Sequence, residues 1–182
     1  MVSRAIALFS GGFLLLNVLG ELLRGGFDET VVLVDLRCGP FLLTRLVLVS
    51  TAALLLAWAV RPEPGRVRRA ATAAAAGLLA LVALANTADF YGHLARGLIE
   101  PPLPVPLSLP VAVGLVLVLR GVLRSAPGEV PPRSRRRDLA VLAGSGVLFA
   151  LFPLLQITFF GSTDYRRPAD AVVVFGAKAY AD

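Results

Sequence analysis

The chain has 182 residues, of which 57 % are hydrophobic and 16 % are charged, and its mean hydropathy is +0.77. Intrinsic disorder is excluded, because disordered chains combine low hydrophobicity with high net charge. A soluble globule is disfavoured, because too little polar surface exists to cover the apolar mass. One cysteine, Cys38, and one histidine, His93, exclude an intrachain disulfide framework and a metal centre built from several such ligands. The composition therefore predicts a membrane protein.

Five stretches of the chain lack acidic and basic residues. They cover residues 5–20, 46–60, 70–88, 101–119 and 139–163. About 20 apolar residues in a helix cross a hydrocarbon core of about 30 Å. None of the stretches shows the strict alternation of barrel strands. The sequence predicts an all-α polytopic membrane protein, with a transmembrane region over residues 1–163 and helices at about 5–23, 40–60, 70–88, 107–123 and 139–161.

The first stretch also has features of a secretory signal, since Arg4 precedes an apolar core. No small-x-small cleavage site follows that core, so we favour a retained span over cleavage.

Prolines shape the fourth and fifth stretches. The run of prolines between Pro101 and Pro106 does not fit a helix interior, so we expect residues 100–107 to be extended. Ser108 is then a natural N-cap, and Pro110 lies in the first turn. Pro153 is expected to kink the last helix.

Basic residues between the spans predict the topology. With the amino terminus inside, Arg4, the 61–69 loop and the 120–138 loop place eleven arginines in the cytoplasm. The outer loops and the tail carry six basic residues. Short loops rich in arginine and lysine stay in the cytoplasm, so the carboxyl-terminal tail is predicted outside. The run Arg133–Arg137 then faces anionic lipid, which explains the pI of 10.7 without a nucleic-acid partner.

The first outer loop, residues 27–37, is acidic at both ends and apolar in the middle. The apolar part is too short to span a bilayer. It can lie along the outer interface, which we favour, or pair as a short strand with another outer segment.

Two charged residues are candidate intramembrane polar sites. Arg45 lies inside the second predicted span, and Asp89 lies at the outer end of the third. Such residues contact an ion or substrate in some proteins, but a long arginine more often extends to the interface, here toward Asp89 or Asp35. Three amides in the spans, Asn17, Asn86 and Gln156, are expected to form hydrogen bonds between helices rather than line a transport path. His93 is read as an interfacial residue, with a proton shuttle as the alternative.

Aromatic residues near the predicted span ends suit an aromatic belt. They are Phe90 and Tyr91 at the outer end of the third span and Trp58 at the inner end of the second.

The composition changes after residue 163. A polar linker precedes the continuous apolar run Ala171–Phe175, which is followed by Gly176, Ala177 and Lys178. A wholly apolar strand ending in glycine is typical of a central parallel strand that enters a ligand-facing turn.

These residues also resemble a known family. The segment 168–177, followed by Tyr180-Ala181-Asp182, is similar to the opening of the SanA/YdcF/ElyC family domain. The Gly26-Phe27-Asp28 and Val34–Arg37 motifs of the outer loop resemble the membrane region of larger members. The resemblance implies a Rossmann-like α/β domain outside the cytoplasmic membrane, linked to envelope integrity and peptidoglycan precursor metabolism. One soluble member is associated with S-adenosylmethionine. Gly176, Ala177 and Lys178 would line the ligand pocket of that domain, while the cofactor of this chain is left unknown.

Only the first strand and turn of that domain lie within residues 164–182, so we expect the chain to be inactive alone. It would be a fragment, the product of a truncated reading frame, or a subunit completed by another polypeptide. A small polytopic scaffold or partner subunit without catalytic activity is the alternative. A transporter is the weakest reading, because the spans lack clustered ionisable residues. The alanine, leucine and arginine content suggests a bacterium with a GC-rich genome, whose cytoplasmic membrane would hold the chain.

Overall fold

The computed structural model describes residues 1–24, 33, 41–62, 65–125, 134–161 and 164–165. Within this part the chain is all-helical apart from two very short strands. The helices are α1 (Val2–Arg24), α2 (Phe41–Val60), α3 (Arg66–Ala95), α4 (Ser108–Arg124) and α5 (Arg135–Gly161), and the strands are β1 (Ile99–Glu100) and β2 (Asp164–Tyr165). The prediction of five helices is confirmed for this part of the chain.

Four of the helices are long and apolar enough to cross a membrane, namely α1, α2, α3 and α5. The fifth, α4, has 17 residues, or about 25 Å at 1.5 Å per residue. Its span is therefore not confirmed by length. The helix is short because Pro101–Pro106 keep the preceding residues out of helical geometry.

Side-chain contacts bring one end of each of the five helices together. Arg4 at the start of α1 bonds to Ala59 at the end of α2 and to Asp138 at the start of α5. Arg69 at the start of α3 bonds to Leu123 near the end of α4. The five helix ends near these contacts therefore form one end of the molecule.

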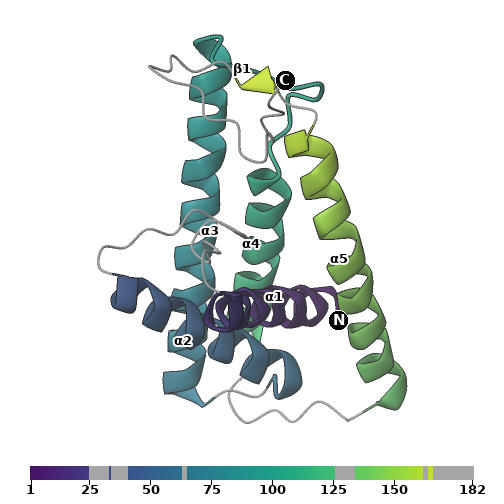
Figure 1. The fold of residues 1–182 in the computed structure, drawn as a ribbon. Coiled ribbons are helices and arrows are strands. Elements are labelled where there is room, and N and C mark those ends of the chain that lie inside the picture. Colours follow the sequence, from purple (N-terminus) through teal and green to yellow (C-terminus); the bar gives the residue numbers. More distant parts are fainter. Residues whose placement is uncertain (25–32, 34–40, 63–64, 126–133, 162–163, 166–182) are drawn as a thin grey trace, which may run out of the picture.

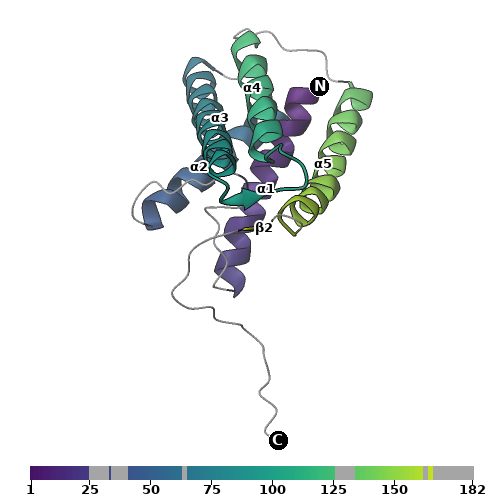
Figure 2. The same ribbon diagram turned by 90° about the horizontal axis from the view of Figure 1, so that it is seen from above.

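The helices are not all upright. In Figure 1, α3, α4 and α5 run lengthwise, whereas α1 is seen almost along its axis and α2 crosses near the foot of α3. Figure 2 shows α1 at full length, passing between α4 and α5 and extending beyond them. Contacts of α1 with α2, α4 and α5 make it the central helix of the fold.

Glycines allow α1 to approach its neighbours. A Cβ atom on Gly11 would lie 2.8 Å from Cγ of Leu56 and 2.9 Å from the carbonyl oxygen of Ala52, both on α2. A Cβ atom on Gly12 would lie 2.9 Å from the ring of Phe149 on α5. Helices associate in lipid largely through such close contacts between small residues.

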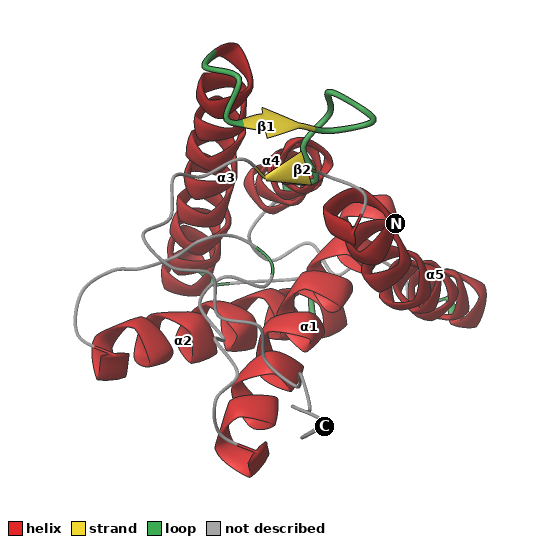
Figure 3. Cartoon of the chain, turned by 45° about the horizontal axis from the view of Figure 1, so that its top comes forward, coloured by secondary structure: helices red, strands yellow, loops and turns green. Residues whose placement is uncertain are grey.

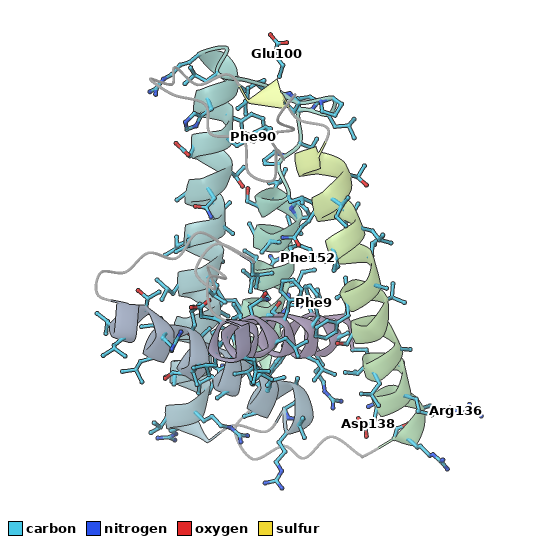
Figure 4. The ribbon with its side chains drawn as sticks, in the orientation of Figure 1. Phe9, Phe90, Glu100, Arg136, Asp138 and Phe152 are labelled. Atoms are coloured by element: carbon cyan, nitrogen blue, oxygen red, sulfur yellow. The ribbon has the colours of Figure 1, made fainter. Side chains whose placement is uncertain are left out.

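Aromatic rings join α1 to α5. Phe9 and Phe13 on α1 pack against Phe149 and Phe152 on α5, with edge-to-face ring centroids 5.1 to 5.5 Å apart. Figure 4 shows Phe9 and Phe152 side by side between the two helices. Each such aromatic pair contributes about 0.5–1.5 kcal/mol beyond area burial.

A small antiparallel ladder joins the α3–α4 connection to the residues that follow α5. Ile99 pairs with Tyr165 and Glu100 pairs with Asp164. Figure 3 shows both strands near the start of α4. The predicted Rossmann-like strand at Ala171–Phe175 lies outside the described residues.

Two local predictions were wrong. The N-cap of α4 is Leu107, with no side-chain cap, and Ser108 instead bonds to Thr87 on α3 at 2.8 Å. Trp58 is 2 % exposed, so its indole lies in the core beside Gly121 rather than in an aromatic belt. Pro110 does lie in the first turn of α4, and Pro153 lies inside α5.

The helices also extend past several predicted limits. The third begins at Arg66 and ends at Ala95, although the sequence indicated 70–88. Charged residues stop a hydrophobic stretch but not a helix, because arginine is a good helix former.

Of the loop predicted to lie outside, residues 27–37, only Leu33 is described, and it is 6 % exposed. The rest of the predicted interfacial segment lies outside the described residues.

Candidate functional site

The two ends of the helical unit differ in charge. The end formed by the starts of α1, α3 and α5 and the ends of α2 and α4 carries ten arginines among the described residues: Arg4, Arg61, Arg66, Arg68, Arg69, Arg120, Arg124, Arg135, Arg136 and Arg137. We call this the arginine end. Among the described residues of the arginine end, the acidic residue is Asp138, in the first turn of α5. Figure 4 shows Arg136 and Asp138 there, with Glu100 at the opposite end.

Arg4 connects three helices at the arginine end. Its Nη2 lies 3.1 Å from Oδ1 of Asp138, and its Nε donates to the carbonyl oxygen of Ala59 at 2.8 Å. The last four carbonyls of a helix have no partner inside the helix, so Arg4 satisfies one of those at the end of α2. The Arg4 side chain is 20 % exposed and that of Asp138 is 48 % exposed, which places the pair at the margin of the core.

Two further arginines bond to backbone carbonyls where helices end. Arg69 donates from α3 to the carbonyl of Leu123 in the last turn of α4. Arg68 donates to the carbonyl of Arg61, just after α2, at 3.0 Å. Positive charge beside a helix C-terminus is favourable, because the unpaired carbonyls carry partial negative charge. The arginines therefore stabilise helix ends as well as marking one side of the molecule.

The opposite end has a different set of polar contacts. Nδ1 of His93 lies 2.8 Å from the backbone carbonyl oxygen of Asp89 and 3.4 Å from its carboxylate. Thr87 bonds to Ser108 and also donates to the carbonyl of Ala83, both at 2.8 Å. The bond between Thr87 and Ser108 joins α3 to α4 near the β1–β2 ladder, whereas the other bonds lie within α3.

The structure places the two predicted intramembrane polar residues on different helices, Arg45 on α2 and Asp89 on α3. Arg45 is the fifth residue of α2, about 6 Å along the axis from its start, and its side chain is half-buried. Asp89 has a side chain that is 75 % exposed and pairs with His93 on its own helix. Gly176, Ala177 and Lys178 lie outside the described residues, so their predicted role is not tested.

Asn17 was expected to bond to a neighbouring helix. Instead, its amide donates to the carbonyl of Phe13 in the same helix at 2.6 Å. No group of three or more histidine, cysteine or acidic residues that could hold a metal ion occurs in the described part of the chain. The two ends of the helical unit differ in charge and in their hydrogen bonds.

Sequence reasoning missed the ion pair of Arg4 with Asp138 and the bond of Thr87 to Ser108. The partners are 134 and 21 positions apart. A single polar residue at a helix end gives no sign of which helix will neighbour it. The only signal was that each residue lies at or near the end of a predicted helix, where a polar partner is expected.

Comparison with known proteins identified no similarity: no family model, no curated protein and no solved structure matches the chain.

Proposed function

We propose that the chain is a multi-pass anchor of the bacterial cytoplasmic membrane that presents the segment after residue 165 on the outer side. The observation that carries this proposal is the pairing of β2 with β1 at the end opposite the arginines. Arginine-rich loops favour the cytoplasmic side. The end with the ladder is then outside, and the tail departs from there.

The proposal extends to the type of protein. The tail resembles the opening of a SanA/YdcF/ElyC domain, and an anchor that holds it outside suits a role in cell-envelope or peptidoglycan metabolism. Gly176, Ala177 and Lys178 are proposed to line the ligand pocket of that domain. This part of the proposal rests on the resemblance of the tail and on the charge asymmetry of the helical unit.

A second candidate is a scaffold or partner subunit without catalysis, and the packing of α5 favours it. In its most apolar stretch 11 % of residues are buried, against 39 % in each of α1, α2 and α3. Lipid or another membrane protein would cover the remaining surface of α5.

The side of each end can be tested with single cysteines. Cys38→Ser removes the one native cysteine. Leu103→Cys then reports on the ladder end and Val67→Cys on the arginine end. The two native side chains are 54 % and 85 % exposed, respectively, and neither is charged. A membrane-impermeant maleimide should label Leu103→Cys in intact cells and Val67→Cys only after permeabilisation. The reverse pattern would overturn the topology.

The metabolic role needs a separate measurement. Cells that lack the protein should accumulate or lose lipid-linked or soluble peptidoglycan precursors, measured by chromatography. Unchanged precursor pools, together with the expected labelling pattern, would favour the non-catalytic scaffold.

A further inference from the structure

An apolar groove lies between α4 and α5, with α1 as its floor. Its volume is about 250 Å³. The floor comes from Ile6, Phe9 and Ser10, and Leu33 contributes to the lining from outside the helices. The only polar side chain among the lining residues is that of Ser10. The groove is larger than the cavity of about 150 Å³ that holds a benzene molecule in an engineered protein core.

The shape of the groove follows the helices. One wall extends from Leu107, the N-cap of α4, to Gly114, and the α5 wall extends from Leu148 to Leu155. Seven residue steps correspond to about 10 Å along each helix axis. Both helices pack on α1 but share no substantial contact in the described part of the chain. The groove is therefore a slot along α4 and α5.

The slot opens to the surface between those two helices. Pro110 on α4 and Leu151 on α5 both line it and are both exposed, Leu151 to 45 %. Two features keep it open. Gly114 offers no side chain on the α4 wall, and a Cβ there would lie 3.3 Å from Ile6. The aromatic contacts of Phe9 with Phe152 hold α5 against α1 rather than against α4.

We propose that this slot binds one acyl chain of a bilayer phospholipid. Water gains too few hydrogen-bond partners in such a lining, and an empty slot would lose dispersion contacts along its whole wall. Within the bilayer, the molecules that reach an opening between two apolar helices are lipids. A linear chain entering beside Pro110 and Leu151 matches a narrow slot parallel to the helices. The inference rests on membrane insertion, not on the proposed role of the tail.

Neighbouring leucines on α5 offer a matched pair of variants. Leu155 lines the slot, whereas Leu154 does not line it and is 61 % exposed. In native mass spectrometry from a mild detergent, the wild type should retain one phospholipid. Leu155→Trp should lower the retained fraction about tenfold, because the indole fills the slot. Leu154→Trp should retain lipid as the wild type does. Equal retention in both variants would show a surface lipid and overturn the proposal, as would no retention in the wild type.

A second measurement needs no substitution, so it holds even if Leu155→Trp fails to fold. A phosphatidylethanolamine with a diazirine in one acyl chain is reconstituted with the wild-type chain and irradiated. Crosslinks should concentrate on residues 107–114 and 148–155. Crosslinks distributed instead over exposed side chains such as Leu142, Val147 and Ile157 would contradict a specific slot.

Discussion

Arg4 and Asp138 form an ion pair of 3.1 Å between the first turns of α1 and α5. Arg4 also donates to Ala59 at the end of α2. One guanidinium thus fixes three helix ends on the same side of the molecule. The pair is partly exposed, so its effect on stability is modest, whereas the bond to the carbonyl is made by a side chain that is largely buried.

Substitutions at the two positions should therefore differ. Asp138→Asn is expected to lower the free energy of unfolding by about 0.5–1 kcal/mol. Arg4→Met should lower it by about 1–2 kcal/mol, because the carbonyl of Ala59 also loses its donor. Thermal unfolding in one detergent, with the double variant completing the cycle, measures both values. An equal loss in the two single variants would contradict the role of the carbonyl bond.

Gly11 should tolerate no side chain. Gly11→Ala forces a Cβ against Leu56 and the backbone of Ala52, so we expect a loss of about 1–3 kcal/mol from overpacking. Gly77→Ala is the matched control, because a Cβ there meets nothing within 4 Å. It should leave stability unchanged or raise it by up to about 1 kcal/mol through helix propensity. Similar unfolding temperatures for the two variants would be inconsistent with the close approach of α1 to α2.

The bond of Thr87 to Ser108 should contribute to the packing of α3 on α4. Thr87→Val keeps the shape of the side chain and removes both of its hydrogen bonds. We expect it to lower the free energy of unfolding by about 0.6 kcal/mol or somewhat more. Thr158→Val is the control, since Thr158 is exposed and its hydroxyl donates to Leu154 in its own helix. Unfolding of both variants in the same detergent provides the comparison. A loss of stability in Thr158→Val at least as large as that in Thr87→Val would contradict a contribution of the Thr87–Ser108 bond to helix packing.

The register of the ladder can be tested by disulfide formation. In the Cys38→Ser background, Glu100→Cys with Asp164→Cys places two cysteines directly opposite each other, at a separation of about 4.5–5.5 Å that a disulfide can bridge. Glu100→Cys with Tyr165→Cys is the control, because adjacent strand residues point to opposite faces. Gel mobility without reductant should show an intramolecular bridge in the first variant only. A disulfide in the control variant alone would show that the true register of the ladder differs from this one by one residue.

The sequence predicted the number and positions of the helices, because uncharged apolar runs have few alternatives in a membrane. It placed the ends less well. The helix from Arg66 to Ala95 has 30 residues, or about 45 Å, which is longer than a hydrocarbon core of about 30 Å. Ser108 was taken as a cap because its local pattern fits one, but its hydroxyl bonds to Thr87 on another helix.

The features that sequence reasoning could not predict depend on which helices become neighbours. The arginine excess predicted one polar side, but not that Arg4 and Arg69 would bond to the carbonyls of other helices. The strands that form the ladder have two residues each, which is too short for any periodic pattern. The slot between α4 and α5 arises because both helices pack on α1.

The contact between Arg4 and Asp138 also orders events during synthesis. The two residues are separated by 134 positions, so the ribosome releases Arg4 long before its acidic partner. After α2 has been made, the guanidinium can already bond to Ala59, and the ion pair forms only when the fifth helix reaches the bilayer. The bridge therefore closes late in biogenesis, along with the aromatic contacts that join α5 to α1.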